Sequence, residues 1–298
     1  MRDRATFRAM LKPLFALLAL AAPVSLTAQT QTAPAPGDAI PADWHDIPDN
    51  EIMVITLKDG RQVFIRLAAR FAPAHVANIR KFTEARWWDD ASVYRVQENW
   101  VVQWGDASEK KPLPPEIIAR PPAEFEIGAF TPAQRLSRAD GYSTASGVTA
   151  DGWPIATDGK AAWLTHCYGS VGVARDSLPD TGNGAELFTP IGQSARRLDR
   201  NYTVVGRIIE GMQYFSAMPR SSAAMGVYKD ESERTPIASV RLASQLPEDE
   251  RPRFQYRAAD NPRYAAMIQK REHPDAPTIA TGVEVCDLAP AVRRTPTE

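Results

Sequence analysis

Arg95 is the residue of this sequence whose chemistry most needs an explanation. It stands in the stretch 92–106 (SVYRVQENWVVQWGD), among β-branched and aromatic residues typical of strands. Side chains of a strand alternate between its faces, so Val93, Arg95 and Gln97 share one side. Because an unpaired buried charge is costly, the guanidinium must either reach water at the edge of a hairpin or be held over an apolar groove, where it can donate hydrogen bonds to a bound molecule. The stretch alone leaves both interpretations open.

Two short strands, 93–96 and 100–104, position Arg95, and the polar turn 97–99 joins them. Similar patterns predict further strands, and apolar stripes predict helices from Pro73 to about residue 86 and over 211–218. Short, evenly spaced strands favour a closed barrel or a sandwich. The further strands are expected at 52–57, 63–67, 170–174, 185–191, 202–209 and 237–242.

Composition and charge argue against several classes of function. The chain has 298 residues, of which 44% are hydrophobic and 24% charged, with a formal charge of -1. This balance is ordinary for a globular protein and gives no electrostatic basis for binding nucleic acid or an anionic membrane. The four histidines are scattered without metal-ligand spacing, and no Ser/His/Asp signature with a supporting elbow appears. We therefore expect no metal, no cofactor and no hydrolase chemistry.

The N-terminus predicts export. Four basic residues precede the short apolar run 14–23, and Ala28 follows as a small residue at a cleavage site, in the order of a secretory signal. The run is too short for a comfortable membrane span, although an uncleaved anchor stays open as the alternative. Residues 1–28 are therefore expected to be a signal peptide directing the protein to the periplasm, and the proline-rich residues 29–48 an extended linker.

Cys167 and Cys286 are the two cysteines of the chain. In an exported protein an even count permits a disulfide, which here would tie the C-terminal tail to the core. In the chain-entropy model, closing so long a loop contributes on the order of 4–5 kcal/mol, less any strain. Two unrelated buried thiols are the alternative.

Two segments depart from the strand pattern. Seven prolines fall between residues 107 and 162, and glycines and polar residues fill much of the rest. We expect an insertion, 107–165, with little regular structure, which is either a lid over a site or a passive addition. After residue 246 the charge density rises sharply. Residues 247–298 are therefore expected to be a C-terminal extension, with one helix over 262–271 and a loose end.

Two separated stretches resemble the cyclophilins, a family of peptidyl-prolyl cis-trans isomerases. The family reads F-H-R, a short turn and F-M-x-Q-G-G-D, where this chain has V-Y-R, a turn and W-V-V-Q-W-G-D. It later reads G-x-x-x-M-A, an N-G loop, S-Q-F-F and W-L-D, where this chain has G-S-V-G-V-A from Gly169, N-G-A-E-L-F from Asn183 and R-L-D ending at Asp199. The resemblance covers 51–106 and 169–242, and exported bacterial members with such an insertion are the most similar.

The resemblance implies a mainly β fold: a closed eight-stranded antiparallel barrel over 49–246, capped by two helices, with a substrate groove on its outer face. It implies that Arg95 is the catalytic arginine and that Gln103 hydrogen-bonds the backbone of a proline-containing peptide. No cofactor takes part in the family's reaction. The implied substrate-binding residues are Trp100, Val101, Phe188 and Leu198 in a proline pocket, Ala174 and Arg175 flanking the peptide, and Glu186 and Tyr202 beside them.

The chain departs from the family pattern at several of these positions. Tyr94 replaces the family's histidine, and Glu186 replaces its glutamine, so that Glu186 could pair with Arg95. Two functions are alternatives: an isomerase that assists folding at X–Pro bonds of exported proteins, and a non-catalytic module that binds proline-containing peptides or unfolded chains on the same barrel. Further replacements are Trp100 for phenylalanine, Val101 for methionine, Trp104 for glycine, Arg175 for asparagine, Arg197 for tryptophan and Tyr202 for histidine.

Overall fold

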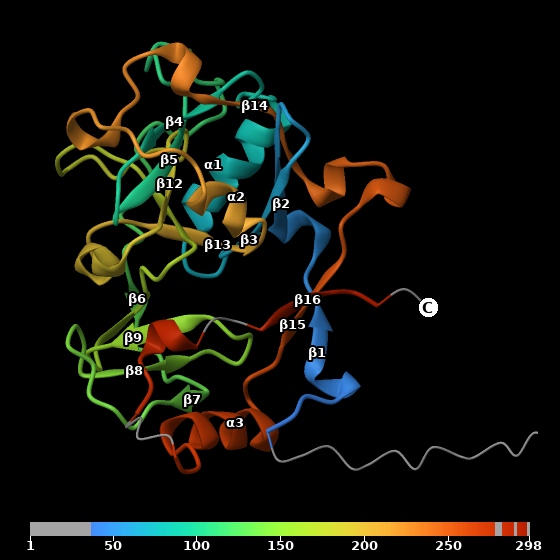
Figure 1. Ribbon diagram of the computed structural model, residues 1–298, viewed down its shortest axis with the longest axis vertical. Coiled ribbons are helices and arrows are strands. Elements are labelled where there is room, and N and C mark those ends of the chain that lie inside the picture. The colour runs from blue at the N-terminus through green and yellow to red at the C-terminus, as the bar shows by residue number, and fades with distance from the viewer. Residues whose placement is uncertain (1–36, 278–281, 289–290, 297–298) are drawn as a thin grey trace, which may run out of the picture. The chain divides into compact units, whose positions relative to one another are not determined.

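The computed structural model describes residues 37–277, 282–288 and 291–296, and the expected signal peptide lies outside them. Eight strands form a closed barrel in the order β11-β12-β5-β4-β14-β2-β3-β13 (Figure 1). All of these pairings are antiparallel, which confirms the fold that the resemblance implies. The strands are β2 (Ile52–Leu57), β3 (Gln62–Leu67), β4 (Ser92–Val96), β5 (Val101–Gly105), β11 (Ser170–Val173), β12 (Leu187–Pro190), β13 (Val204–Glu210) and β14 (Thr235–Leu242).

The first hairpin shows how the sequence produces these strands. β2 and β3 each place most of their side chains in the protein interior, and they pair from Ile52 opposite Arg66 to Thr56 opposite Gln62. Gly60 lies in the turn between them with a φ of 87°, a left-handed conformation that glycine adopts without a steric penalty. The turn dipeptide and the apolar runs beside it therefore fix the register of the pair.

Two helices pack against the core of the barrel, as expected: α1 (Pro73–Glu84) and α2 (Met212–Ser216). Pro73 is suited to the first turn of α1, because the N–H that it lacks would have no partner within the helix there. The buried apolar residues that attach the helices to the barrel include Val76, Ile79 and Phe82 from α1 and Phe215 from α2.

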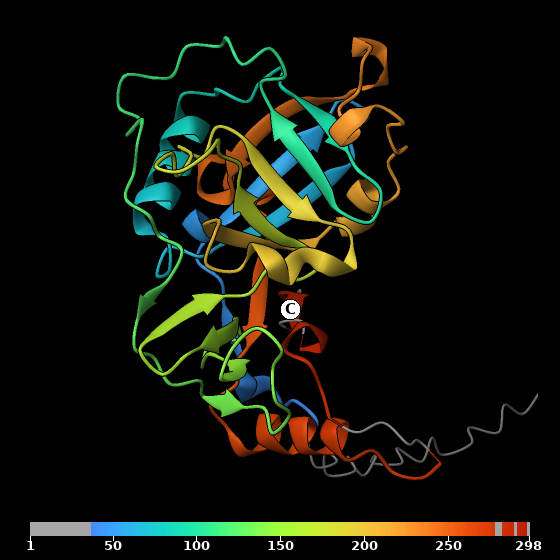
Figure 2. The same cartoon turned by 90° about the vertical axis from the view of Figure 1, so that its left-hand side faces the viewer.

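The insertion differs from its expectation, because residues 107–165 contain a five-stranded antiparallel sheet instead of mostly irregular structure (Figure 2). Its strands are only two to four residues long, so none of them shows a clear alternation in the sequence. Their order is β6-β10-β9-β8-β7. The strands are β6 (Ile127–Gly128), β7 (Gln134–Arg135), β8 (Ala145–Val148), β9 (Pro154–Thr157) and β10 (Ala161–Leu164).

A three-stranded sheet joins segments from both ends of the described chain: β1 (Trp44–Asp46), β15 (Phe254–Arg257) and β16 (Val292–Arg294). The segment 29–48, expected to be an extended linker, thus contributes a strand, and the expected loose end contributes another. No local pattern reveals such pairings, since the partners lie far apart in the sequence. The expected helix is present as α3 (Pro262–Glu272). Short 3-10 helices complete the structure: Pro41–Asp43, Asp49–Glu51, Gln193–Leu198, Ala224–Gly226, Glu231–Glu233, Ala243–Gln245, Glu248–Glu250 and Val285–Asp287.

A disulfide joins Cys167, just before β11, to Cys286 in the C-terminal extension. The two Cα atoms are 5.3 Å apart, within the usual range for a disulfide, although 119 positions separate the residues in the sequence. The structure therefore contains the disulfide between the C-terminal tail and the barrel, and not two unrelated buried thiols.

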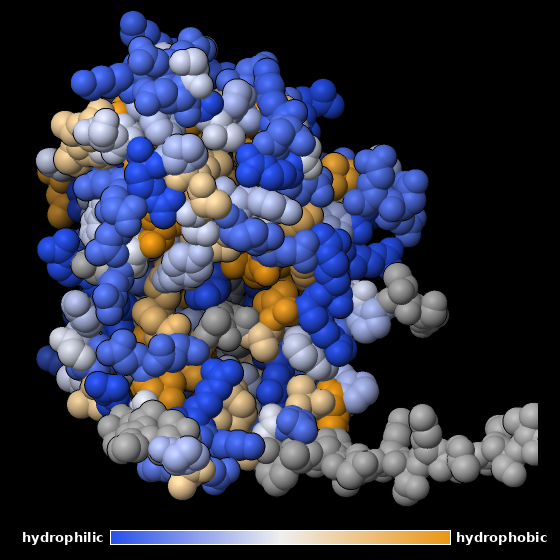
Figure 3. Space-filling model, in the orientation of Figure 1, coloured by the Kyte–Doolittle hydropathy of each residue, from blue (hydrophilic) through white to orange (hydrophobic). Residues whose placement is uncertain are grey.

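Within the described ranges, no helix is both long and apolar enough to cross a membrane. Hydrophilic residues dominate the face of the molecule shown in Figure 3, and hydrophobic residues lie between them in scattered patches. The expected signal or anchor segment belongs to the residues outside these ranges.

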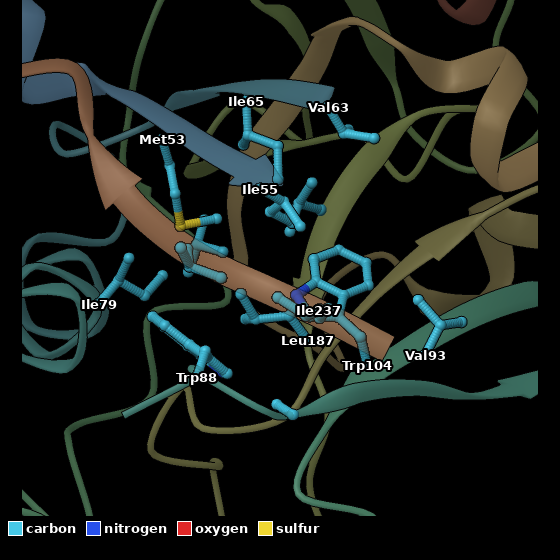
Figure 4. Close-up of a cluster of buried hydrophobic side chains, with 14 of the residues drawn as sticks. Met53, Ile55, Val63, Ile65, Ile79, Trp88, Val93, Trp104, Leu187 and Ile237 are labelled. Atoms are coloured by element: carbon cyan, nitrogen blue, oxygen red, sulfur yellow. The ribbon is translucent and has the colours of Figure 1, made fainter. Parts of the chain in front are cut away.

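Trp104 occupies the barrel interior at the position where the family pattern has glycine. Its side chain is fully buried, and its ring centroid lies 5.2 Å from that of Phe215 in α2. Because strand side chains alternate, this replacement fills the core and leaves the neighbouring Gln103 on the outer face. Figure 4 labels residues of this core: Met53, Ile55, Val63, Ile65, Ile79, Trp88, Val93, Trp104, Leu187 and Ile237.

Candidate active site

The pairing of β4 with β5 is irregular between Val93 and Arg95, so Val93 lies in the core and does not share one side of the strand with Arg95 as expected. Arg95 is held on β4 by three acceptors that carry no charge. Its Nη1 donates to Oε1 of Gln103 at 3.0 Å, its Nη2 to Oε1 of Gln97 at 2.7 Å and its Nε to the backbone carbonyl of Met225 at 2.6 Å. Partial burial lowers the pKa of Arg95, yet a guanidinium stays protonated in proteins. The structure therefore has a positioned cation whose charge no carboxylate among its hydrogen-bond partners neutralises.

A cavity of about 160 Å³, lined by both apolar and polar side chains, adjoins this guanidinium. Val101 and Phe188 are buried and supply apolar surface, whereas Gln103 and Arg95 supply polar groups at the same cavity. Such a combination of apolar lining and a few placed polar groups is typical of a ligand pocket. It brings together nine of the ten expected site residues: Arg95, Trp100, Val101, Gln103, Ala174, Arg175, Phe188, Leu198 and Tyr202.

The rings of this cavity are held by close contacts. Phe188 meets Tyr202 edge-on, with ring centroids 5.7 Å apart, and His166 lies parallel to Phe188 at 6.1 Å. Gly172 on β11 faces Phe188 so closely that a Cβ atom there would collide with the ring. Gly172 is therefore required for the observed position of Phe188, and His166 supports that position through ring stacking.

Cations stack on two aromatic side chains of the same cavity. The guanidinium of Arg197 lies 5.4 Å from the ring centroid of Trp100, and that of Arg175 lies 4.5 Å from the centroid of Tyr202. Both arginines stand where the family pattern has an uncharged residue. The rim of this cavity is consequently more positive than the family pattern implies.

Glu186, the tenth expected residue, does not pair with Arg95 as the sequence suggested. Its Oε2 accepts a hydrogen bond from the Tyr94 hydroxyl at 2.7 Å, and its Oε1 accepts one from the backbone N–H of Asp106 at 2.7 Å. The two replacements, Tyr94 and Glu186, thus satisfy each other. Burial, against hydrogen bonds that favour the carboxylate, raises the pKa of Glu186 to about 7. Burial and the neighbouring Glu186 carboxylate also raise the pKa of Tyr94.

Glu186 lines a second cavity, of about 350 Å³, that adjoins the first and shares Gln103, Ala174 and Arg175 with it. Residues of the insertion reach this cavity through Glu109, Lys111 and others. The insertion, expected to be either a lid over a site or a passive addition, thus lines a cavity next to the one at Arg95.

Several residues that shape the site were missed by sequence reasoning. The carbonyl of Met225, which holds Arg95, lies 130 positions further along the chain, in a short 3-10 helix where Met225 itself has a φ of 61°. Gly226 beside it packs so tightly on Gln97 that a Cβ atom would clash. The glycine was a weak local signal for a tight approach, but its partner could not be inferred without the fold.

The sequence matches the model of the family described as cyclophilin type peptidyl-prolyl cis-trans isomerase/CLD over residues 52–243. The fold is similar to the crystal structure of cyclophilin AquaCyp293 from Hirschia baltica, with a TM-score of 0.67 and 23% identity, covering 87% of this chain and 96% of that one. A cyclophilin-type isomerase from Cryptosporidium parvum, crystallised in the presence of the dipeptide Ala-Pro, has a TM-score of 0.40 and 13% identity, covering 64% of this chain and 98% of that one. No curated protein matches. Because the family model spans more than half of its length, this chain belongs to the cyclophilin-type peptidyl-prolyl cis-trans isomerase family.

Proposed function

We propose that this chain catalyses the cis-trans isomerisation of X–Pro peptide bonds at the cavity that Arg95 adjoins. The observation that carries the proposal is a guanidinium fixed by three uncharged acceptors beside a pocket to which Val101, Phe188 and Leu198 supply apolar surface. Rotation about an X–Pro bond has a barrier of about 18–20 kcal/mol, because amide resonance must be broken. No bond to an enzyme nucleophile is needed, so the chemistry requires only a site that favours the twisted amide.

Arg95 supplies the group that discriminates between the planar and the twisted amide. When the amide twists, the proline nitrogen regains its lone pair and becomes a hydrogen-bond acceptor. An N–H of Arg95 that donates to this nitrogen stabilises the transition state more than the ground state, which lowers the barrier. Each tenfold gain in rate requires about 1.4 kcal/mol of this preference.

The other residues of the cavity bind and orient the peptide in this proposal. Phe188, Val101 and Leu198 bury the proline ring, with Trp100 and Tyr202 at its sides. Ala174 and Arg175 flank the peptide backbone, and Gln103 holds it by a hydrogen bond. An immobile ring lets the preceding carbonyl turn alone, so positioning adds to the effect of the guanidinium.

The proposed substrates are X–Pro bonds of exported proteins that fold in the periplasm. The signal-like residues 1–28 support this compartment. The disulfide between Cys167 and Cys286 is consistent with it, since disulfides persist in oxidising environments.

A non-catalytic module that binds proline-containing peptides is the second candidate, and one observation favours it. The carboxamide of Gln103 is engaged at both ends, because its Oε1 accepts from Arg95 and its Nε2 donates to the hydroxyl of Tyr94. A carboxamide held in this way has less freedom to bond a substrate backbone. The site would then bind the peptide without accelerating the isomerisation of its X–Pro bond.

One experiment separates the two candidates. Isomerisation of a short X–Pro peptide is measured by NMR exchange with the wild type, with Arg95→Ala and with a matched control, Arg61→Ala. Arg61 is a half-exposed arginine between β2 and β3. We expect the wild type and Arg61→Ala to accelerate exchange equally and Arg95→Ala to lose at least tenfold, with peptide binding retained. Equal activity of Arg95→Ala would overturn the role of Arg95. Binding without acceleration by the folded wild type would establish the binding module.

A further inference from the structure

A chain of hydrogen bonds connects Glu186 with the guanidinium of Arg95. The Tyr94 hydroxyl donates to Oε2 of Glu186 at 2.7 Å, and Nε2 of Gln103 donates to the oxygen of Tyr94. Nη1 of Arg95 then donates to Oε1 of Gln103 at 3.0 Å. Four side chains, two on β4, one on β5 and one on the residue just before β12, thus form one connected path across neighbouring strands.

The direction of every bond in this path follows from the carboxylate at its end. An ionised carboxylate only accepts, so Tyr94 must donate its single hydrogen to Glu186. The oxygen of Tyr94 is then free to accept the N–H of Gln103, which turns the carbonyl oxygen of Gln103 toward Arg95. The reversed carboxamide would place N–H groups of Gln103 against N–H groups of Arg95, which is unfavourable.

A protonated Glu186 removes this constraint. Its carboxyl group can donate to the oxygen of Tyr94, whose hydrogen is then free to turn toward the carboxamide of Gln103. The Tyr94 hydroxyl then no longer holds the Gln103 carboxamide in one orientation, and whenever the carboxamide reverses, Gln103 offers Arg95 no acceptor. Arg95 then keeps only Gln97 and the carbonyl of Met225 as partners.

We propose that Glu186 is a positioning residue for the reaction: its carboxylate form sets the orientation of the Gln103 carboxamide and thereby fixes Arg95 for catalysis, whereas its protonated form releases both. The inference rests on the proposed isomerase function of the same site. It concerns Tyr94 and Glu186, the two positions where this chain departs from the histidine and glutamine of the family pattern.

The pocket is shaped to hold the carboxyl group of Glu186 in this place. The position opposite it is Gly105, where a Cβ atom would collide with the carboxylate and where φ is 152°. The backbone N–H of Asp106 occupies the second oxygen of Glu186 at 2.7 Å. Both oxygens of Glu186 therefore have fixed partners. The carboxyl group stays in place when it is protonated, so the change reaches Tyr94 through the direction of the hydrogen bond.

The charges around Glu186 favour a proton near neutral pH. Four other carboxylates and two cations line the same cavity, so the negative charges are in excess. Lys111 directs its ammonium group to the backbone carbonyls of Trp87 and Asp89, and Arg175 directs its guanidinium to those of Asp176 and Asn201. The ionisable groups facing Glu186 are Tyr94 from β4, Asp106, Glu109 and Lys111 from the segment after β5, and Arg175, Asp176 and Asp180 from the segment after β11.

Burial, with Asp106 and Glu109 adding repulsion, raises the pKa of Glu186 to about 7. Burial acts on Asp106 in the same direction, but hydrogen bonds from Ser108, Lys110 and Lys111 outweigh it and hold its pKa below the ordinary value. Asp106 therefore remains ionised while Glu186 titrates. The competent orientation of Gln103 is present above this pKa and is lost as the pH falls through it, so activity should decline on acidification.

Two variants isolate the path. Glu186→Gln is neutral at all pH values, and its single carbonyl oxygen faces two donors, the Tyr94 hydroxyl and the Asp106 N–H. If the carbonyl oxygen of this variant side chain accepts from the Asp106 N–H, its NH₂ group faces Tyr94 and donates to the tyrosine oxygen. The hydrogen bonds of the path then run in the same direction as with a protonated Glu186. Tyr94→Phe cuts the path but leaves the carboxyl group of Glu186 in place. Both variants should lose the pH step. Loss of one well-oriented hydrogen bond corresponds to about a three- to tenfold decrease in kcat/KM.

The experiment measures kcat/KM for an X–Pro peptide between pH 5.5 and 8.5, at about half-unit intervals, together with the NMR signals of the Gln103 side-chain amide and the Arg95 Nε–H without peptide. We expect both readouts of the wild type to change with one midpoint near the pKa of Glu186, and to be flat in Glu186→Gln and Tyr94→Phe. Glu109→Gln is the control: it removes a facing charge outside the path, so the step should remain and its midpoint should fall.

The outcomes distinguish the two proposals. A flat profile in an active wild type, or a step that persists in Glu186→Gln, would overturn the positioning role of Glu186 and leave the isomerase function standing. If the wild type shows no activity at any pH, the isomerase function fails, and the NMR titration decides the positioning alone. In that case, Gln103 and Arg95 signals that change with the midpoint of Glu186 support the positioning role. Signals that do not change over this pH range overturn it.

Discussion

At the scale of single residues, the site depends on how a charge is held without being neutralised. Arg95 is bonded to two carboxamides and one carbonyl, and each of these acceptors leaves the positive charge available to a ligand. A planar guanidinium can meet several such acceptors at once, whereas an ammonium group is a compact point charge on a flexible stem. Arginine, with its fixed fork of donors, is therefore suited to this position in a way that lysine is not.

The raised pKa of Glu186 also makes a prediction for stability. Its pKa rises from an ordinary 4.5 to about 7 in the folded protein, so the folded state binds this proton more tightly than the unfolded chain. Between these values the free energy of unfolding should fall as the pH rises, by at most about 3 kcal/mol for this one group. Urea unfolding at pH 5 and pH 8 measures the effect. The change between the two pH values should be smaller in Glu186→Gln than in the wild type, and identical changes would contradict the prediction.

The residues of the site differ in how far the sequence could reveal them. Arg95, Gln103 and Phe188 stand at positions that the family motifs mark, and nine of the ten motif positions line one cavity. The acceptor at Met225 and the stacking of His166 on Phe188 could not be inferred, because they depend on contacts between segments that are separated in the chain. The sequence suggested a pairing of Glu186 with Arg95 because it gives residue types but not the directions of side chains.

At the scale of elements, the insertion supplies the N-terminal cap of α1. The residue preceding this helix is Ala72, whose side chain cannot accept a hydrogen bond. Glu124 of the insertion takes its place, accepting from the backbone N–H groups of Ala74 at 2.8 Å and His75 at 3.0 Å, and lying 2.6 Å from Nδ1 of His75. A carboxylate there satisfies donors that have no partner within the helix and complements the helix dipole.

Removing this cap should loosen both α1 and the insertion. Glu124→Ala leaves two backbone donors and the His75 ring without their acceptor, and we expect a loss of about 1–3 kcal/mol in the free energy of unfolding. Amide hydrogen exchange should accelerate at Ala74, His75 and the residues around position 124. The exposed Glu116 of the same insertion provides the matched control, Glu116→Ala, which should leave exchange unchanged. Equal exchange in both variants would show that the cap does not hold the helix.

The elements of the barrel were predictable and those of the insertion were not, for a physical reason. β2 and β3 carry runs of apolar residues bounded by a glycine turn, and α1 carries a regular stripe, so local sequence specifies each of them. The insertion strands are two to four residues long, and β6 pairs with β10, more than thirty positions away. Strands this short are stabilised by their partners, and their own residues contain too little periodicity to predict them.

At the scale of the whole molecule, Arg66 of β3 connects three parts of the fold. Its Nη2 forms an ion pair with Asp151 of the insertion at 3.0 Å, and its guanidinium lies 4.7 Å from the ring centroid of Trp153. The same guanidinium lies 4.4 Å from the ring centroid of Tyr256 in β15 of the C-terminal extension. Burial lowers the pKa of this arginine, which the neighbouring carboxylates partly offset. The barrel, the insertion and the extension thus share one buried cation.

The disulfide between Cys167 and Cys286 is the covalent counterpart of these contacts, and it makes the last prediction. It closes a loop between residues 119 positions apart, so in the chain-entropy model it restricts the unfolded chain by about 4–5 kcal/mol. The double variant Cys167→Ala/Cys286→Ala, which leaves no single reactive thiol, should unfold at lower urea concentration than the wild type. Reduction of the wild type should lower its midpoint similarly and leave the double variant unchanged. Titration of unfolded, unreduced wild type should detect no free thiol, and two thiols per chain would contradict the link. An unchanged midpoint in the double variant would contradict this prediction. It would mean that the extension unfolds separately from the barrel, so that the disulfide does not stabilise the barrel.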